Sequence, residues 1–486
     1  MCLGLRPVPN CAHRAPDQHR GWLLSRDMIL EKSGAYWISS MMIGAEFWDR
    51  KPIGSSMAFN LVSGFSRLSR PGHDNSGEGL GCRKECLFQW AEVAVFQLTK
   101  ERKCSIVRLM IIRTLKNKLL QQLKFENKGV VIYGARQVGK TTLAQNLISE
   151  LGLKTLYING DEREQSWDLM TSRDLHKLQS LVYGYELLFI DEAQRIPNIG
   201  INIKIMLDNI KGLKVLATGS SSLDLASEVS EALTGRVYDY TLYSISTNEL
   251  RTTTDYLGIE KSLEERLIFG SYPEIFSKTR MDDKQEYLRN LTNKYLYKDI
   301  LEYVGLKNSD KILNLLKLLA FQIGSQVSIT ELANNLNLSR TLVEKYLDLL
   351  QKSFIIFRLH GFARNLRKEM KKMDKIYFYD LGIRNTLIGN FNLLSNRDDV
   401  GKLWENFLVV ERLKKQENER DFVSRYFWRL QSGEEIDLVE ESGGILTGYE
   451  FKWNKKISKT PTSWIKNYDN ARFEIINRDN WQDFVI

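Results

Sequence analysis

The sequence predicts an α/β protein in which a parallel sheet is followed by a helical unit and then by a second α/β unit. Between about residues 110 and 250, the apolar strand-like runs GVVIYG, KTLYING, LLFIDE and KVLATGS alternate with segments of helix length. This alternation is typical of a parallel sheet with crossover helices. Residues 255–320 have a mainly helical pattern, and short alternating strands such as GYEFKW return near the C-terminus.

A chain of 486 residues is too long for one compact core, so roughly two to four domains are expected. The composition is that of a globular protein, and no apolar run approaches the roughly 18 residues that span a bilayer. Shifts in pattern predict five parts: 1–109, a poorly ordered or spurious N-terminal extension; 110–250, the domain with the parallel sheet; 251–306, a helical lid or connector; 307–372, a winged helix-turn-helix; and 373–486, the second α/β domain.

The first 109 residues differ from the rest of the chain. They contain all five cysteines and five of the eight prolines, and no sustained helical or strand period appears before about Leu87. An odd number of cysteines without framework spacing argues against a disulfide scaffold, and the opening residues lack the apolar core of a secretory signal. We therefore expect a cytoplasmic protein whose N-terminal extension carries no core chemistry.

A phosphate-binding loop follows the first strand of the predicted sheet. GARQVGKTTL fits the pattern G-x-x-x-x-G-K-[ST], with a strand before it and an amphipathic helix after it. Glycines let backbone N–H groups wrap the phosphates, the lysine reaches the β- and γ-phosphates, and the threonine hydroxyl binds Mg²⁺. The predicted nucleotide-binding residues of this loop are Gly134, Ala135, Arg136, Gln137, Val138, Gly139, Lys140, Thr141 and Thr142.

Acidic and hydroxyl residues follow two later strands of the same sheet. In LLFIDEAQRI, we expect Asp191 to hold Mg²⁺ through its water shell and Glu192 to polarise the attacking water. In KVLATGSSS, Ser220 or Thr218 is expected to act as a sensor between these acids and the γ-phosphate. Arg236, in LTGRVYDY, is a second candidate catalytic residue that would contact the γ-phosphate of its own chain or of a neighbouring one. The alternative for Arg236 is an ordinary surface arginine.

The order of these motifs resembles a known family. GARQVGKTTL, FIDEAQRIPN, VLATGSSSLDLASEVSEALTGR and SYPEIF follow one another as in a prokaryotic family of AAA-type P-loop ATPases whose members carry a C-terminal domain catalogued as DUF4143. The resemblance covers about residues 110–460. It implies an AAA-like ATPase core with ATP and Mg²⁺ as its ligands, followed by a winged helix and a restriction-endonuclease-like α/β domain. It implies no defined cellular task.

The segment VSITELANNLNLSRTLVEKYLDLLQKS has the pattern of a helix-turn-helix, with Ser339 as the expected N-cap of the second helix. Residues 307–372 contain twelve Lys or Arg and five Asp or Glu, a net charge of +7 in a chain whose total is +9. This excess favours contact with nucleic-acid phosphates, with Arg340 and Lys345 facing the groove. A winged helix that only packs between domains is an equally good interpretation.

The stretch GYEFKW belongs to a candidate metal site. As a strand, it places Glu450 and Lys452 on one face and its aromatic side chains on the other. Asp437, in the preceding GEEIDLVEE, completes the D-(x)n-E-x-K pattern of restriction-endonuclease-like folds. Carboxylates on adjacent strands can bind a divalent ion that activates water, and Glu405, in the preceding helix, is the expected additional ligand. The alternative is a solvated acid–base pair on a half-buried strand.

These motifs favour a protein that binds and hydrolyses ATP and has DNA-facing C-terminal modules. One alternative is an ATP-gated switch that binds DNA or a protein with little turnover, and another is a metal-dependent nuclease regulated by ATP. A kinase is disfavoured because Glu192 stands where NTPases hold the acid that orients water. The expected ligands are ATP and Mg²⁺, the expected macromolecular partners are DNA and further copies of the chain, and no membrane contact is expected.

Overall fold

The structure is a computed structural model that describes residues 111–162, 165–219, 233–295, 309–362, 373–430, 432–454 and 460–486. Every described residue belongs to one compact unit, which comprises residues 107–486. The predictions made for residues 1–109 therefore lie outside the described residues.

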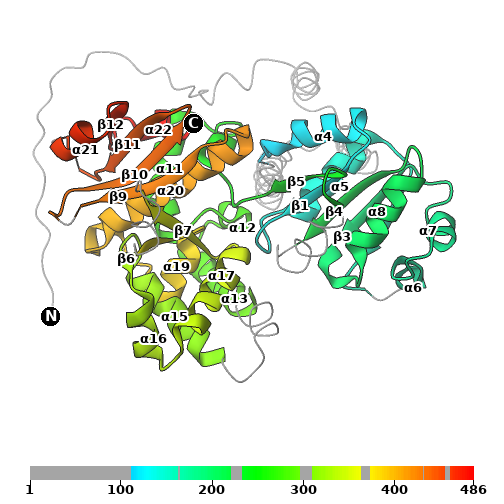
Figure 1. Cartoon of the computed structure of the whole chain (residues 1–486), viewed down its shortest axis with the longest axis horizontal. Helices are drawn as coiled ribbons and strands as arrows, with labels where there is room; N and C mark the ends of the chain where they lie inside the picture. Colours follow the sequence, from blue (N-terminus) through cyan, green and yellow to red (C-terminus); the bar gives the residue numbers. More distant parts are fainter. Residues whose placement is uncertain are drawn as a thin grey trace, which may run out of the picture. The chain divides into compact units, whose positions relative to one another are not determined.

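A five-stranded parallel sheet, with strand order β2-β3-β4-β1-β5, forms the first part of the described chain (Figure 1). Its strands are β1 (Gly129–Tyr133), β2 (Thr155–Asn159), β3 (Leu187–Asp191), β4 (Lys214–Gly219) and β5 (Val237–Thr241). Every residue of β1 and β3 is buried, as expected for parallel strands that are covered on both faces. The α/β fold class predicted from the sequence is confirmed.

Helices cover both faces of this sheet. They are α4 (Leu115–Phe125), α5 (Lys140–Leu151), α6 (Gln165–Met170), α7 (Leu175–Leu181) and α8 (Ile199–Asn209). Because side chains alternate along a strand, Val130 and Ile132 of β1 join one hydrophobic cluster with α4 and α5. Val131 and Tyr133 point the other way and join a second cluster with α7 and α8.

A helical connector follows the sheet. Its described helices are α10 (Thr247–Leu250), α11 (Tyr256–Phe269), α12 (Pro273–Ser277) and α13 (Met281–Tyr295). A capping box, in which Ser246 and Glu249 satisfy each other's backbone N–H groups, starts α10. The side chain of Asp255 caps α11.

The rest of the described chain is built on a seven-stranded sheet of order β12-β11-β10-β9-β7-β8-β6. Its strands are β6 (Gln326–Val327), β7 (Ile356–Gly361), β8 (Asp374–Phe378), β9 (Ser424–Arg429), β10 (Glu435–Ser442), β11 (Ile445–Phe451) and β12 (Ala471–Ile476). The pairs β7–β9 and β11–β12 are parallel, and the other four pairs are antiparallel. The boundary predicted after residue 372 falls between the paired strands β7 and β8, so the two C-terminal parts share one sheet.

The described α-helices that accompany this sheet are α15 (Ser309–Phe321), α16 (Ile329–Leu336), α17 (Arg340–Lys352), α19 (Leu381–Ile388), α20 (Val400–Glu419), α21 (Thr462–Asn467) and α22 (Trp481–Val485). The side chain of Ser339 caps α17, as expected. Along the chain, α20 is followed by the three strands β9, β10 and β11 and then by α21 and β12. Among the described helices, none is both long and apolar enough to cross a membrane.

Candidate nucleotide site and C-terminal carboxylate cluster

The phosphate loop connects β1 to α5. Gly134 has a φ of 151° and Gly139 a φ of 98°, and a Cβ atom on Gly134 would lie 2.2 Å from the carbonyl oxygen of Leu242. Both positions therefore require glycine. The buried Lys140 donates from Nζ to the carbonyl oxygens of Gly134, at 3.0 Å, and Ala135, at 2.9 Å. The loop is thus curved around the lysine that is expected to meet the phosphates.

Two hydroxyl groups and one carboxylate meet at the carboxyl edge of the sheet. Thr141 donates from Oγ1 to Asp191, at 3.1 Å from Oδ1 and 2.9 Å from Oδ2. Thr218 also donates its hydroxyl to Asp191. Because β4 lies between β1 and β3, Thr218 at its end stands between the phosphate loop and the acidic strand. Hydroxyl and carboxylate oxygens are the donors that suit Mg²⁺, so these residues fit the predicted ion.

The backbone around Glu192 is held by its neighbours. Glu192 adopts a left-handed conformation, with a φ of 49°, directly after β3, and its N–H donates to Thr218 Oγ1 at 3.1 Å. Gln194 Nε2 donates to Glu192 Oε2 at 2.6 Å. Gly160 lies against this turn, because a Cβ atom there would be 2.3 Å from the carbonyl oxygen of Glu192. The acid predicted to polarise water is therefore carried by a fixed turn beside Asp191.

The two remaining predicted residues have different outcomes. Ser220 lies outside the described residues, whereas Thr218, its alternative, lies beside both acids. Arg236 precedes β5, and its carbonyl accepts from the N–H of Gly129, the first residue of β1. Its Nε atom is 2.6 Å from Asp208 Oδ1. Arg236 is thus at the amino edge of the parallel sheet, opposite the phosphate loop, so the predicted contact within the same chain is wrong. Contact from a neighbouring chain stays a prediction.

Arg113 supports the phosphate loop and was not singled out from the sequence. Its Nη1 atom donates to the carbonyl oxygen of Val138 at 2.6 Å, and its Nη2 atom donates to that of Tyr243 at 2.5 Å. Its Nε atom is 2.9 Å from Glu249 Oε1, and the two side chains are only 10% and 2% exposed. In MIIRTL, the arginine has no local pattern that signals these partners, because all of them are distant in the sequence.

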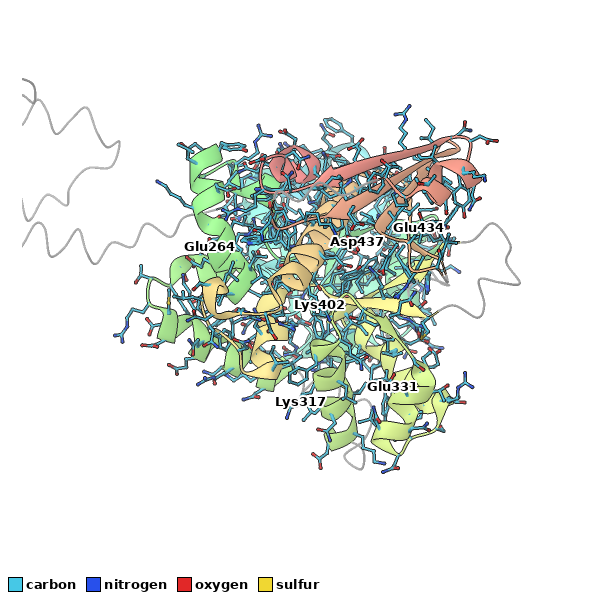
Figure 2. All side chains as sticks on the ribbon, turned by 90° about the vertical axis from the view of Figure 1, so that its left-hand side faces the viewer. Glu264, Lys317, Glu331, Lys402, Glu434 and Asp437 are labelled. Atoms are coloured by element: carbon cyan, nitrogen blue, oxygen red, sulfur yellow. The ribbon has the colours of Figure 1, made fainter. Side chains whose placement is uncertain are left out.

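In the C-terminal domain, Asp437 and Glu450 lie on the same face of two paired strands. The antiparallel register ends at the pair of Leu438 with Tyr449, and Asp437 and Glu450 are the residues that directly adjoin this pair. A register irregularity between β10 and β9 lies between Ile436 and Val439 and so includes Asp437, which Figure 2 labels on the C-terminal sheet. Asp437 Oδ2 accepts the N–H of Phe451 at 3.0 Å. The hairpin predicted from GYEFKW and the strand before it is therefore formed.

A buried lysine stands among these carboxylates. Lys375 Nζ is 2.9 Å from Glu405 Oε1, 2.6 Å from Glu435 Oε1 and 3.4 Å from Asp437 Oδ1, and its side chain is 2% exposed. Tyr377 donates from its hydroxyl to Glu405 Oε1 at 2.6 Å. Lys375 was not predicted from the sequence, although a lysine at the second position of the strand DKIYF, directly before three apolar residues, is an unusual feature that could have drawn attention to it.

Burial and mutual repulsion alter the protonation of this cluster. Burial, followed by the charge of Asp437, raises the pKa of Glu405 to about 7, and the same two causes raise the pKa of Glu450. Burial alone would lower the pKa of Lys375, but the surrounding acidic groups hold it well above its ordinary value. Lys452 Nζ is 2.5 Å from Glu450 Oε1, which helps to raise the pKa of Lys452. Both ammonium groups are therefore charged at neutral pH.

The four predicted residues of the C-terminal site thus come to one region, but ammonium groups lie against their carboxylates. Lys375 contacts Glu405 and Asp437, and Lys452 contacts Glu450. In the part of the chain that the structure describes, no group of three or more His, Cys, Asp or Glu side chains is placed to hold a metal ion. The three carboxylates were expected to share a divalent ion, but each of them instead lies against an ammonium group.

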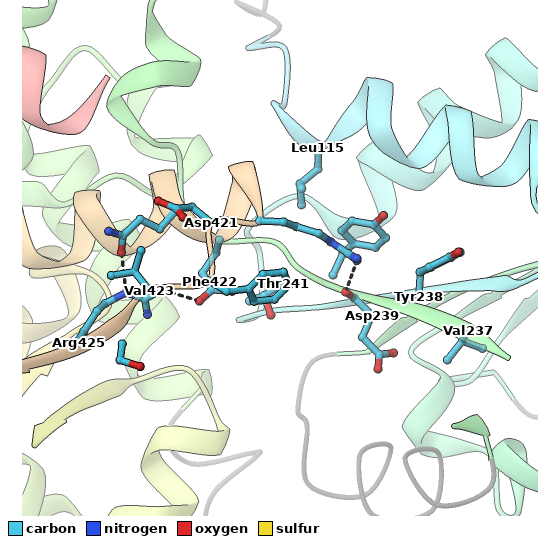
Figure 3. Close-up of a pocket in the computed structure, with 14 residues that line it drawn as sticks. Leu115, Val237, Tyr238, Asp239, Thr241, Asp421, Phe422, Val423 and Arg425 are labelled. Atoms are coloured by element: carbon cyan, nitrogen blue, oxygen red, sulfur yellow. Dashed lines mark hydrogen bonds and ion pairs between the residues drawn. The ribbon is translucent and has the colours of Figure 1, made fainter. Parts of the chain in front are cut away.

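A pocket of about 590 Å³ lies along β5 and the end of α20 (Figure 3). Arg420 donates from Nη2 to the carbonyl oxygen of Asp239 at 3.3 Å, and its guanidinium carbon is 4.4 Å from the ring centroid of Tyr240. The lining residues are Leu115, Val237–Thr241, Gln416, Glu417 and Arg420–Arg425. Since none of these is a predicted site residue, this pocket belongs to neither site.

Family models match three parts of the chain: an AAA domain at residues 126–251, the domain of unknown function DUF8612 at 260–394, and the domain of unknown function DUF4143 at 400–478. The uncharacterized protein MJ1544 of Methanocaldococcus jannaschii is 28% identical over 414 residues, which cover 80% of this chain and 86% of that protein.

Two further similarities involve branch-migration proteins. RuvB, a Holliday junction branch migration complex subunit of Acholeplasma laidlawii, is 44% identical over 68 residues, or 14% of this chain and 18% of that protein. The solved Thermotoga maritima RuvB branch migration motor is 16% identical and covers 51% of this chain and 90% of that chain. The TM-score of this structural match is 0.28.

Proposed function

We propose that this chain, in which an AAA domain precedes a DUF4143 domain, binds ATP at the phosphate loop and hydrolyses it, and that its C-terminal modules contact DNA. The AAA domain supports nucleotide binding and hydrolysis in general. The proposal rests chiefly on the meeting of Thr141, Asp191 and Thr218 beside the fixed turn of Glu192.

The phosphate loop is proposed to bind the β- and γ-phosphates. Lys140 exchanges its two bonds with Gly134 and Ala135 for bonds to phosphate oxygens, while the helix N-terminus of α5 adds positive potential. Thr141 supplies a hydroxyl ligand for Mg²⁺, and Asp191, which accepts the hydroxyl hydrogen bond of Thr141, holds the ion through its water shell. The ion, when bound, neutralises charge on the phosphates.

Glu192 is proposed to orient and polarise the attacking water. Its backbone is held by Thr218 and lies against Gly160, so little reorganisation is needed when the reaction begins. The hydroxyl of Thr218 accepts from the backbone N–H of Glu192 and donates to Asp191. Thr218 is therefore proposed to take the role of γ-phosphate sensor that was expected of either Thr218 or Ser220.

A chain of polar contacts favours the ATP-gated switch as a second candidate. Arg113 joins Val138 of the phosphate loop to Glu249 of α10. In the same short helix, Thr247 donates from its backbone N–H and its hydroxyl to Glu411 Oε2 of α20, at 2.6 and 2.7 Å. These contacts give a physical route by which a change at the phosphates would shift α20, with or without rapid turnover.

We interpret α15 to β8 as a winged helix, and its charge supports contact with DNA phosphates. Arg340 and Lys345 are exposed on α17. Glu344 and Asp348 occupy the same helix and are each 3.2 Å from Arg358 Nη1. This mixture of charges supports positioning on the phosphate backbone rather than reading of bases. The pairing of β7 with β9 ties one wing strand into the C-terminal sheet, which supports packing as a second role for this unit.

Steady-state phosphate release from ATP, measured with and without a panel of single-stranded and double-stranded nucleic acids, tests this function. Hydrolysis that depends on Lys140 and Glu192 and increases with DNA supports the leading proposal. Tight ATP binding with negligible turnover, together with ATP-dependent binding of DNA, favours the switch. Absence of ATP binding would contradict both.

A further inference from the structure

We propose that the ammonium group of Lys375 is the resident cation of the C-terminal carboxylate cluster and occupies the position that a divalent ion takes in a metal-dependent site. The cluster consists of Glu405, Glu435, Asp437 and Glu450. The inference goes beyond the proposed ATPase, because none of these residues belongs to the phosphate loop or its acidic strand.

Lys375 contacts three carboxylates, and those of Glu405 and Asp437 accept hydrogen bonds from its ammonium group. An ammonium group has three hydrogen-bond donors and no acceptor. Lys375 Nζ meets three carboxylate oxygens, at 2.6 Å from Glu435, 2.9 Å from Glu405 and 3.4 Å from Asp437. One cation thus lies against oxygens from α20 and β10, as a bound metal ion would.

The position of Lys375 is fixed by the backbone on both sides. β8 pairs with β6 and with β7, and the register places Gln326 and Leu359 opposite Lys375. Gly324 closes the same region, since a Cβ atom there would lie 3.2 Å from Glu405 Oε2. The lysine therefore enters the cluster from a strand that is paired on both sides and not from a mobile surface segment.

Cationic side chains balance most of the negative charge of the cluster, so a divalent ion is not needed to neutralise it. Lys452 Nζ is 2.5 Å from Glu450, and Arg429 Nη1 is 3.5 Å from Glu435. With Lys375, three cationic side chains therefore face four carboxylates. A buried charge persists only where it is paired, and removing one partner of such a group is strongly unfavourable. Loss of Lys375 would leave Glu405 and Asp437 to repel each other.

The resident cation also joins two family domains. Lys375 lies in the segment that matches DUF8612, whereas all four carboxylates lie in the segment that matches DUF4143. A divalent ion can take the central position only when Lys375 leaves it. The first of these domains thereby keeps the carboxylates of the second in a metal-free state.

Manganese binding to the nucleotide-free full-length protein tests this inference. Free Mn²⁺ is counted from its electron paramagnetic resonance signal for the parent protein, for Lys375→Met, and for each of them with Asp437→Asn. We expect Lys375→Met to gain one Mn²⁺ site. This site should bind at least about tenfold more tightly than any Asp437-dependent site of the parent protein, and the added substitution Asp437→Asn should remove it. Equal Asp437-dependent binding by the parent, or no gain in a folded Lys375→Met, would overturn the proposal.

Thermal unfolding keeps the test decisive if Lys375→Met is unstable. If the lysine acts through its charge, the Tm of Lys375→Met should rise when Mn²⁺ is added, and it should also rise when Glu405→Gln is introduced as a second substitution. Lys375→Arg, which keeps the charge, should gain no Mn²⁺ site. If the lysine only fills space, neither addition raises the Tm, and the proposal fails. Lys402→Met, at an exposed lysine of α20 that bonds Ser325 Oγ, is the matched control and should change neither readout.

Discussion

The hydroxyl oxygen of Thr141 lies 2.9 Å from Oδ2 of Asp191, although the two residues are 50 positions apart in the chain. This bond joins the first turn of α5 to the end of β3, and Thr218 joins the same carboxylate from β4. The oxygen ligands expected for Mg²⁺ are thus assembled by the sheet itself. Substitutions at this corner should therefore affect ligand binding more than folding.

Lys140→Ala should weaken ATP binding by roughly 10- to 100-fold or more, because the loop loses its charge-assisted bonds to the phosphates. Titration with a fluorescent ATP analogue measures the dissociation constant. Lys177→Ala, at an exposed lysine of α7, is the control and should bind like the parent. An unchanged dissociation constant for Lys140→Ala would mean that the phosphates bind elsewhere.

Arg113→Ala should lower the free energy of unfolding by about 3–5 kcal/mol, because it leaves the buried carboxylate of Glu249 without its cation. The midpoint of urea unfolding measures this change. Arg251→Ala removes an exposed arginine just after α10 and should shift the midpoint little. Equal effects of the two substitutions would show that the buried ion pair of Arg113 with Glu249 contributes no stability.

Acid should weaken the structure through Glu411. Burial alone would raise the pKa of Glu411, but Lys414 and Arg266 hold it at about 2, below its ordinary value of 4.5. A lowered pKa stabilises the folded state above the unfolded pKa, and this stability is lost as pH falls from 4.5 toward 2.

Between about pH 5 and about pH 3, the parent should therefore lose on the order of 2 kcal/mol through this group, a loss that Glu411→Gln should not show. Urea unfolding of both proteins at the two pH values measures the difference. Parallel pH profiles would contradict the ion-pair assignment.

Reversal of charge at Arg340 and Lys345 should weaken DNA binding and reduce its salt dependence, because fewer counterions are released per complex. The logarithm of the binding constant, plotted against the logarithm of salt concentration, should lose a slope of roughly one for each phosphate contact removed. Unrelated DNA sequences should respond alike. An unchanged slope would assign α17 to packing between domains.

The nucleotide site could be predicted largely from the sequence, because its residues occupy fixed places in short motifs at the ends of apolar strands. The matches to an AAA domain and to DUF4143 confirm the two domains that the order of those motifs indicated. Arg113 could not be predicted, because its partners Val138, Tyr243 and Glu249 are brought to it only by the fold. The misplaced Arg236 shows the same limit, since a local motif does not reveal at which edge of the sheet a residue lies.

Only part of the C-terminal cluster could be predicted from the sequence, because Lys375 is brought to it by long-range strand pairing. Alternation along β10 and β11 placed Asp437 and Glu450 on one face, and the register agrees with it. The entry of Lys375 depends on β8 pairing with β7 and on β7 pairing with β9. Such long-range strand pairing leaves no mark in the residues near the D-(x)n-E-x-K pattern.

Glu192→Gln tests the central claim most directly, because the amide keeps the size of the side chain and removes its negative charge. We expect ATP to bind with the affinity of the parent protein, and phosphate release under saturating ATP and Mg²⁺ to fall by roughly 100-fold or more. Phosphate release at the parent rate, from a variant that is folded and saturated with ATP, would contradict the assignment of Glu192 and with it the proposed hydrolytic site.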